Sequence, residues 1–351
     1  MTDRRFLFII QRGAADGLSI VAPVGDPAFA ALRGLLVEDF AAAPKLDSTF
    51  VLHPALAETG KLYAAKQAVF LHAVASPYRD RSHFDGQNVL ETGGKLPYER
   101  KDGWMNRLLG MLPAAEARAL AVSVTVPAAL RGANPVASYA ASNLPQASDD
   151  LLQRVAMLYS GDAQLHTLWD EAVQIRAMAS DVASGRDAAA TGKLAASLMI
   201  GPQGARVAMI ETGGWDTHTG QRARLGAQMK GLDAMIAAFR QTIGADWANT
   251  LVLVATEFGR TAAVNGTGGT DHGTAAAAML LGGTVRGGRV VADWPGLSAA
   301  QLFEGRDLRP TQSLNAAIAG ALAQHFGLDA RMTMTTLFPE EIGRPTEALL
   351  V

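Results

Sequence analysis

The sequence predicts an α/β fold in which a mostly parallel β-sheet is sandwiched between helices, with a helical insertion. Apolar segments of strand length alternate along the 351-residue chain with longer segments of helical periodicity, as in folds built from strands and crossover helices. Most of the strand-length segments are continuously apolar rather than alternating, which is typical of a parallel sheet covered on both faces.

The predicted strands are short apolar runs that end in polar or glycine-rich sequence. The first, FLFII, runs into the turn sequence RGAADG, and NTLVLVATE is the clearest buried strand of the chain. Their length and their flanking turn residues favour strand over helix. In chain order the predicted strands cover residues 6–10, 67–75, 119–126, 205–211, 249–257 and 275–283.

The predicted helices lie between these strands. The longest, at 221–243, places Leu225, Met229, Leu232, Met235, Ile236 and Phe239 on one face. Other helices are expected at 53–67, 82–93 and 314–328. The stretch 148–199 has helical but no strong strand patterning, and we interpret it as a helical insertion or cap. Since no Pro/Gly/Ser-rich linker marks a boundary, residues 1–351 are predicted to form one domain that carries this insertion.

Composition excludes several classes of protein. The formal net charge is −2, without a long run of either sign, which argues against a nucleic-acid-binding surface. The chain has no cysteine, so disulfides and thiolate metal sites are excluded. No apolar run reaches the roughly 18–20 residues of a transmembrane helix, and the N-terminal apolar stretch is too short for a signal peptide. Nothing in the sequence indicates an oligomeric state.

Carboxylates and imidazoles recur at the predicted strand ends. Because the carboxyl ends of parallel strands meet at one edge of a sheet, we expect these side chains to converge there. Asp, Glu and His are ligands for zinc, manganese and other borderline-to-hard cations. The residues concerned are Asp16, Ser82, His83, Asp85, Asp216, His218, Glu257, Asp271 and His272.

Most of these residues also have an ordinary structural interpretation. Asp16 could be a turn carboxylate before Gly17, and Ser82 with Asp85 forms an S-x-x-D capping box. GGWDTHTG could be a polar turn, and the Asp–His pair in NGTGGTDHG could lie on a surface loop. Glu257 is harder to explain in this way, because a carboxylate at the end of an apolar strand is rarely buried unpaired.

Several common catalytic motifs are absent. The sequence contains no H-E-x-x-H, no G-x-S-x-G and no G-x-x-x-x-G-K-[ST]. No G-x-G-x-x-G follows the first strand, which disfavours a dinucleotide-binding enzyme.

Several short motifs recur in a fixed order along the chain: RGAADGL, HPAL, RSHFDGQNVLETG, GGWDTH, TEFGRT and GGTDHG followed by MLLGG. Together they run from residue 12 to about 288, which is most of the chain. Their order resembles a bacterial family, domain of unknown function 1501, a branch of the alkaline phosphatase and sulfatase superfamily. The resemblance implies an alkaline phosphatase-like fold.

The resemblance implies a role for each strand-end residue. Asp16, Asp216, His218 and His272 match metal-ligand positions, and Ser82 matches the nucleophile at a helix N-terminus. Glu257 and Phe258 stand where the superfamily has an Asp–His pair; Glu257 could still ligate, and Asp271 could contribute. The set is one histidine short of a two-zinc phosphatase, which leaves a single-metal or degenerate site open. Without cysteine, the usual sulfatase chemistry cannot operate.

The leading hypothesis is a metal-dependent hydrolase of a small anionic phosphate or sulfate ester. The expected cofactor is a divalent metal, zinc first, with manganese, calcium or magnesium as alternatives. Ser82 would attack the ester, and Arg81 and His83 beside it complete the predicted catalytic group. Arg12 and Arg260 are further candidates for neutralising the anion, although an individual arginine is more often a surface residue.

Two alternatives remain open from the sequence. The chain could be a non-catalytic, metal-stabilised binding or assembly protein, or metal-bound water could hydrolyse the ester while Ser82 only caps a helix. The resemblance also implies a periplasmic or exported protein. Without that resemblance, the absence of a leader would favour the cytoplasm.

Overall fold

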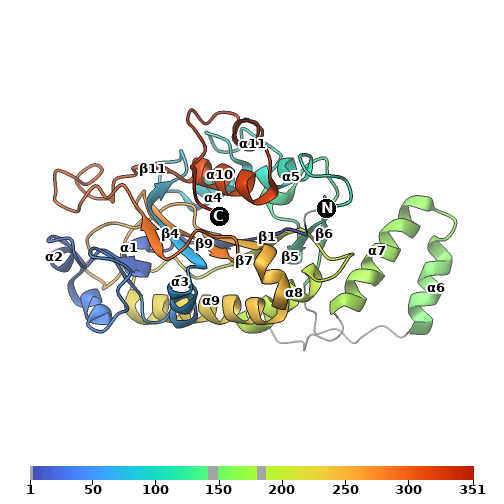
Figure 1. Ribbon diagram of the computed structural model, residues 1–351, viewed down its shortest axis with the longest axis horizontal. Helices are drawn as coiled ribbons and strands as arrows, with labels where there is room; N and C mark the ends of the chain where they lie inside the picture. Colours follow the sequence, from blue (N-terminus) through green and yellow to red (C-terminus); the bar gives the residue numbers. More distant parts are fainter. Residues whose placement is uncertain (1–2, 141–148, 180–186) are drawn as a thin grey trace.

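The computed structural model describes residues 3–140, 149–179 and 187–351. Within them the strands are β1 (Arg5–Gln11), β2 (Val21–Ala22), β3 (Val51–Leu52), β4 (Ala68–Ala75), β5 (Ala119–Val122), β6 (Ala137–Ser138), β7 (Val207–Thr212), β8 (Thr250–Ala255), β9 (Ala276–Gly282), β10 (Arg289–Val291) and β11 (Gln312–Ser313). A nine-stranded central sheet has the order β10-β4-β9-β8-β1-β7-β5-β6, with β11 also paired to β4 (Figure 1). Strands β2 and β3 form a separate antiparallel pair.

The helices connect these strands and cover the sheet. They are α1 (Gly17–Ile20), α2 (Phe29–Arg33), α3 (Ala57–Ala64), α4 (His83–Thr92), α5 (Trp104–Leu109), α6 (Asp149–Tyr159), α7 (Ala163–Ala179), α8 (Ala188–Met199), α9 (Gln221–Ile243), α10 (Leu314–Phe326) and α11 (Ala330–Leu337). Short 3₁₀ turns occupy η1 (Gly34–Phe40), η2 (Ala128–Leu130) and η3 (Gly244–Asn249). No helix of the described ranges is both long enough and apolar enough to cross a membrane.

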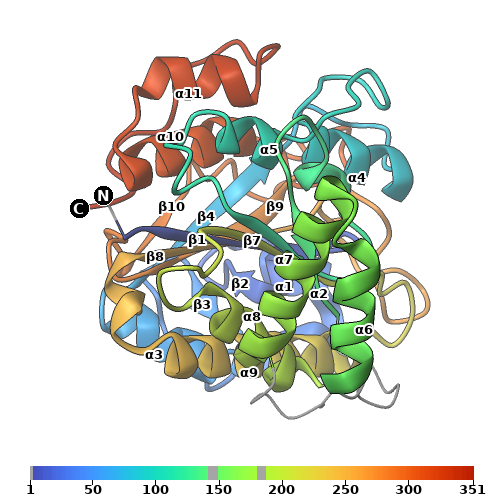
Figure 2. The ribbon, with the colours of Figure 1, turned by 90° about the vertical axis from the view of Figure 1, so that its right-hand side faces the viewer.

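The sheet has a hydrophobic core on each face, and β1 contributes to both. Phe6, Phe8 and Ile10 pack in the core shared with α4, α5, α10 and α11, whereas Leu7 and Ile9 pack in the core shared with α3, α8 and α9. These two helical layers lie above and below the strands in Figures 1 and 2. A strand buried on both faces needs apolar residues at every position, which explains the run FLFII and confirms the predicted fold class.

One central strand runs against the others. β1 is parallel to β7 and β8, whereas β9 is antiparallel to both β8 and β4. The amino end of β9 therefore lies at the same edge as the carboxyl ends of β1, β4, β7 and β8. Convergence is predicted from the carboxyl ends of parallel strands, but a parallel β9 would carry the loop before it to the opposite edge.

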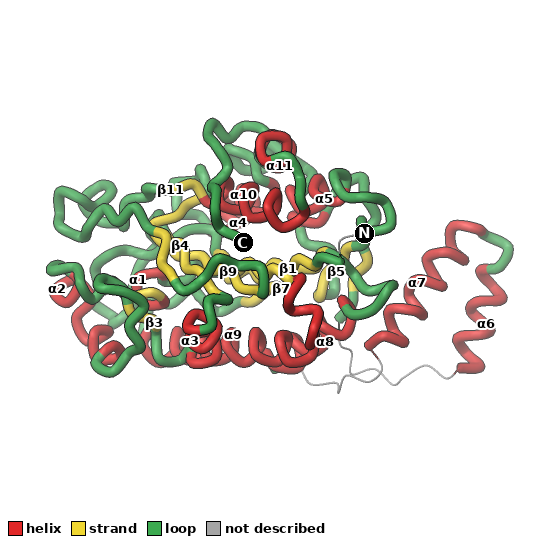
Figure 3. Tube along the Cα trace, viewed as in Figure 1, coloured by secondary structure: helices red, strands yellow, loops and turns green. Residues whose placement is uncertain are grey.

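The stretch 148–199 contains three helices in its described parts. Helices α6 and α7 extend away from the sheet, as Figures 1 and 3 show, whereas α8 packs against α9. Leu194, Leu198 and Met199 of α8 are buried in the core of that face. The helical content matches the sequence pattern, and α8 belongs to the layer that covers the sheet.

Candidate metal centre

Three side chains from distant parts of the chain meet at the shared edge of the sheet. They are His83, the first residue of α4, Asp216 in the loop after β7, and His272 in the loop before β9. One ligand atom from each lies within 4.8 Å of the others. The antiparallel direction of β9 is what brings His272 to this edge.

The Asp216 carboxylate lies at the centre of a group of imidazoles. Its Oδ1 is 2.9 Å from Nε2 of His218 and 3.3 Å from Nε2 of His272. Its Oδ2 is 3.5 Å from Nε2 of His83. All three histidines therefore present the same ring nitrogen to one carboxylate.

The other ring nitrogen of each histidine is held by an oxygen. This pattern places the proton on Nδ1 and leaves the Nε2 lone pair available in the neutral ring. The three contacts are His83 to Glu257 Oε1 at 2.8 Å, His218 to Asp271 Oδ1 at 2.9 Å, and His272 to the backbone oxygen of Arg81 at 2.9 Å.

The grouping of three Nε2 atoms around one carboxylate makes this arrangement suitable for a cation. Nε2 of His83 is buried and has no hydrogen-bond partner in the part of the chain that the structure describes. Nε2 of His218 lies 2.9 Å from Nε2 of His272, and two unprotonated nitrogens at this distance repel unless a proton or a metal ion lies between them. Three imidazoles and one carboxylate are a ligand set that zinc accepts.

Glu257 lies behind His83 and outside the group of three. Its fully buried carboxylate accepts hydrogen bonds from the backbone nitrogen of Gly13 at 2.8 Å, from His83 and from Nε2 of Gln87 at 3.0 Å. Burial raises the pKa of Glu257, but the hydrogen bonds outweigh burial and the pKa lies below its ordinary value. Phe258 stacks on the other side of His83, with ring centroids 5.1 Å apart. Together they fix the orientation of the imidazole.

Asp271 accepts a hydrogen bond from His218, as Glu257 does from His83. It accepts hydrogen bonds from His218 Nδ1 and, at 3.1 Å, from Nδ2 of Asn265. The hydrogen bond from His218, supported by that from Asn265, lowers the pKa of Asp271 below its ordinary value. Unlike Glu257, Asp271 has a half-exposed side chain. Both carboxylates are predicted as ligands, and the structure places each of them against a histidine.

Asp16 is also predicted as a ligand, and its carboxylate accepts hydrogen bonds from several protein groups. It caps α1 through the backbone nitrogen of Leu18, and its carboxylate accepts hydrogen bonds from Ser19 and Gln221 and forms an ion pair with Arg33. Its side chain does not belong to the group formed by His83, Asp216 and His272. Nothing in the sequence distinguishes Arg33, because a single arginine is usually a surface residue.

Two of the candidate arginines are already paired with carboxylates. Arg12 contacts Glu91 and Glu211, and Arg81 contacts Asp307 and Glu304. Arg81 also has a left-handed backbone with φ of 62°, and its carbonyl is the one that holds His272. In this structure Arg81 touches the centre through its backbone, which the sequence could not indicate.

Arg260 reaches the centre directly. Its buried guanidinium donates from Nη1 to Oδ1 of Asp216 at 2.8 Å. Burial raises the pKa of Asp216. The hydrogen bond and charge of Arg260, followed by the charges of His218 and His83, lower it by more, so the pKa lies below its ordinary value. The other terminal nitrogen of Arg260, Nη2, has no partner among the described residues. Arg260 thus keeps Asp216 ionised and ready to bind a cation.

Ser82 is the N-cap residue of α4, but its side chain makes no capping hydrogen bond. Its backbone nitrogen donates to the hydroxyl of Tyr78 at 3.0 Å. The capping-box pattern therefore locates the helix start correctly, whereas the bond expected from the Ser82 hydroxyl is not made. Ser82 directly precedes His83, the first residue of the helix.

Comparison with known proteins identifies the family. Residues 3–337 match the family described as "Protein of unknown function (DUF1501)". The chain belongs to this family. The family resemblance seen in the motif order is thereby confirmed, and no curated protein matches the sequence.

Solved structures with some similarity to the chain include three bacterial proteins. The zinc complex of the C-terminal periplasmic domain of EptC from Escherichia coli has 9% identity and a TM-score of 0.41, over 80% of this chain and 72% of that one. Alkaline phosphatase from the Antarctic bacterium TAB5 has 13% identity and a TM-score of 0.37, over 80% of this chain and 92% of that one. Phosphonate monoester hydrolase of Agrobacterium radiobacter has 13% identity and a TM-score of 0.33, over 93% of this chain and 84% of that one. These superpositions are loose, so roles are assigned from the chain's own geometry.

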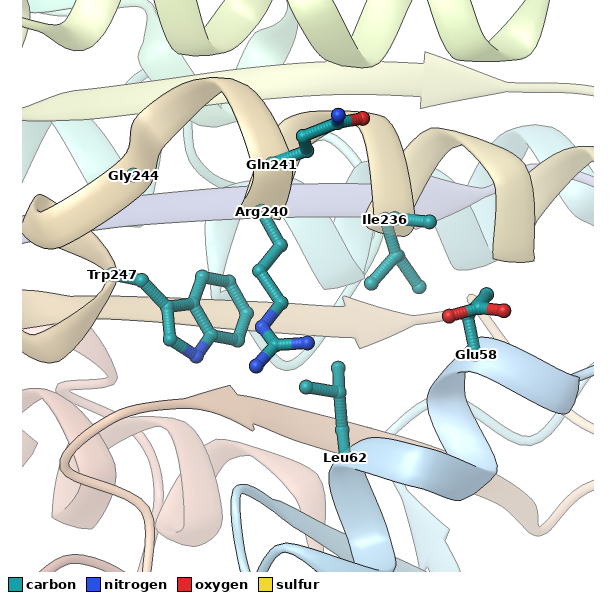
Figure 4. Close-up of a pocket in the computed structure, with 8 residues that line it drawn as sticks. Glu58, Leu62, Ile236, Arg240, Gln241, Gly244 and Trp247 are labelled. Carbon is teal, nitrogen blue, oxygen red and sulfur yellow. The ribbon is translucent and has the colours of Figure 1, made fainter.

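A separate pocket of about 690 Å³ lies between α3, α9 and η3 (Figure 4). The guanidinium of Arg240 lies 6.0 Å from the ring centroid of Trp247, and Glu58 and Leu62 face them from α3. Trp247 precedes β8, so this pocket is near the amino ends of the parallel strands. It shares no lining residue with the candidate metal centre.

Proposed function

We propose that this protein is a metal-dependent hydrolase of phosphate or sulfate esters. The observation that carries the proposal is the convergence of three Nε2 atoms on Asp216, with each Nδ1 held by an oxygen. Ligating histidines in metalloproteins almost always have this second hydrogen bond, which fixes the tautomer and orients the ring.

The residues proposed to hold the cation are Asp216, His83, His218 and His272, with zinc as the best match to their chemistry. A divalent cation bound there supplies Lewis-acid polarisation of the ester and stabilises negative charge on its oxygens. His83 is thus proposed as a ligand rather than as part of the catalytic group. Glu257 and Asp271 are proposed to orient His83 and His218.

Ser82 is proposed as the nucleophile. Its side chain makes no capping bond, and Ser82 directly precedes His83, the first residue of α4. Attack by Oγ on the phosphorus or sulfur would form an ester of Ser82 while the alcohol leaves with the bonding electrons, and water would then hydrolyse that ester. Backbone N–H groups at the amino end of the ten-residue α4 favour the negative charge of the substrate.

The test compares Ser82→Ala with the unmodified protein on p-nitrophenyl phosphate and p-nitrophenyl sulfate. The protein is stripped with a chelator and reloaded with zinc or manganese, and metal content is measured beside activity. We expect Ser82→Ala to lose hydrolysis and keep its metal. Since the side chain makes no capping bond, its unfolding free energy should change by less than the ~1 kcal/mol typical of a lost N-cap.

Ser313→Ala is the matched control. Ser313 caps α10 through a hydrogen bond from the backbone nitrogen of Ala316, so this variant should lose about 1 kcal/mol of stability and keep its activity. Undiminished hydrolysis in Ser82→Ala would remove Ser82 from the mechanism and favour attack by water. A zinc-loaded protein that hydrolyses neither ester would favour the binding or assembly alternative.

A further inference from the structure

We propose that the centre holds one cation rather than two, because the guanidinium of Arg33 takes the place beside Asp16 that a second cation would need. This inference rests on the proposed function and defines the metal stoichiometry of the same site. Asp16 and Asp216 follow the paired parallel strands β1 and β7. Two acidic residues placed in this way suggest two metal ligands, but their surroundings differ.

Both oxygens of the buried Asp16 carboxylate accept hydrogen bonds from protein groups. Its Oδ2 accepts from Ser19 Oγ at 2.9 Å, from Gln221 Nε2 and from Arg33 Nη2, and its Oδ1 accepts from the backbone nitrogen of Leu18 at 3.1 Å. Every one of these partners is a donor. A cation would have to displace several of them and would then meet the fixed positive charge of Arg33.

Arg33 is held in place by more than Asp16. Its side chain is fully buried, its Nη1 lies 3.3 Å from the backbone oxygens of Thr261 and Ala262, and its Nη2 donates to Ser19 Oγ at 2.7 Å. A buried charge that loses its partner is strongly destabilising. Withdrawal of Arg33 to admit a metal is therefore unfavourable.

Gln221 links Asp16 to the loop that carries Asp216. Its Nε2 donates to Asp16, and its Oε1 accepts from Thr270 Oγ1 at 2.6 Å and from Thr217 Oγ1 at 3.0 Å. Thr217 lies between Asp216 and His218 in the sequence. Asp16 thus borders the candidate centre through a layer of hydrogen-bonded protein groups and supports its loops, while the cation is held on the Asp216 side.

Metal counting on the full chain tests this inference. The chelator-treated protein is incubated with zinc, desalted and analysed by inductively coupled plasma mass spectrometry against protein concentration. We expect one equivalent of zinc per chain. The same value is expected for the double variant Asp16→Asn/Arg33→Met, which removes both charges and so avoids leaving either one buried and unpaired.

The outcomes separate this inference from the proposed function. Two equivalents in the unmodified chain, or loss of the single equivalent in a double variant that still folds, would overturn the inference without contradicting a metal-dependent hydrolase. Zero equivalents would overturn the proposed function and this inference with it. The count in the unmodified chain decides between one and two even if the double variant does not fold.

Discussion

Asp16 and Asp216 begin from similar positions in the fold and have different surroundings. Each follows one of two paired parallel strands, and both loops lie at the same edge of the sheet. The side chain of Asp16 is 1% exposed and is surrounded by donors. The side chain of Asp216 is 42% exposed and faces three imidazole nitrogens. Whether a strand-end carboxylate can bind a metal thus depends on whether its neighbours offer protons or lone pairs.

Each aspartate also has an arginine, but the two arginines leave different amounts of the carboxylate free. Arg33 donates to Oδ2 of Asp16, and the backbone nitrogen of Leu18 donates to Oδ1. Arg260 donates to Oδ1 of Asp216. The contact of Oδ2 with His83 is 3.5 Å long. Asp216 therefore keeps one carboxylate oxygen available while its charge is stabilised by Arg260.

Among these variants, we expect Asp216→Asn to have the largest effect on zinc binding. The amide keeps the shape of the side chain and can still accept from Arg260, but it lacks the charge that a divalent cation requires. We expect the zinc-dependent rise in melting temperature to disappear, with a loss of zinc affinity beyond the about 10–100-fold that changes in ligand-orienting groups cause.

Asp329→Asn is a suitable control for this variant. Asp329 is an exposed N-cap of α11 that accepts from the backbone nitrogen of Met332, and asparagine caps helices about as well as aspartate. Zinc binding by this control should equal that of the unmodified chain. Full retention of zinc by Asp216→Asn would show that the carboxylate is not a ligand.

Asp16→Asn is expected to damage stability rather than metal binding. Its amide nitrogen would face the donors of Arg33 and Gln221, and the guanidinium would remain buried without a counter-charge. Breaking a buried ion pair in this way costs about 3–5 kcal/mol. Urea unfolding of the metal-free protein, followed by tryptophan fluorescence, should show this loss, while Asp329→Asn should unfold like the unmodified chain. A drop in zinc affinity without a loss of stability would contradict the assignment.

Much of the fold could be predicted from the sequence because burial on both faces forces continuous apolar strands. The predicted strands at 6–10, 67–75 and 275–283 correspond closely to β1, β4 and β9, and the predicted helix at 221–243 coincides with α9. The two-residue strands β6 and β11 escaped prediction because a pair of residues has no periodicity. The direction of β9 was also hidden, because a buried strand has the same composition in either direction.

The candidate centre could be predicted in outline and not in its details. Glycine-bordered polar residues at strand ends pointed to Asp216, His218 and His272, since the edge of the sheet gathers such loops. The difference between a residue that faces the centre and one that supports it depends on side-chain direction and on distant partners. The pairing of Asp16 with Arg33 and that of Glu257 with His83 join residues whose proximity only the tertiary structure determines.

Glu257→Gln should weaken zinc binding without abolishing it. Glutamine can still accept from His83 through its amide oxygen, but the negative charge that makes the imidazole a better ligand is lost. The expected loss of zinc affinity is about 10–100-fold, measured by competition with a chromogenic chelator. If affinity instead falls as far as in Asp216→Asn, Glu257 is itself a ligand, as the sequence alone suggested.

Asp271→Asn should have the smallest effect of the series on zinc affinity. Asp271 bears the same relation to His218 that Glu257 bears to His83, but its side chain is 48% exposed whereas that of Glu257 is fully buried. Water around the exposed pair screens its charge and can replace part of the hydrogen bond. We therefore expect a loss at or below the lower end of the same range, about 10-fold. A loss larger than that of Glu257→Gln would mean that Asp271 contacts the cation directly, and the difference between the two carboxylates would then reflect ligation rather than burial.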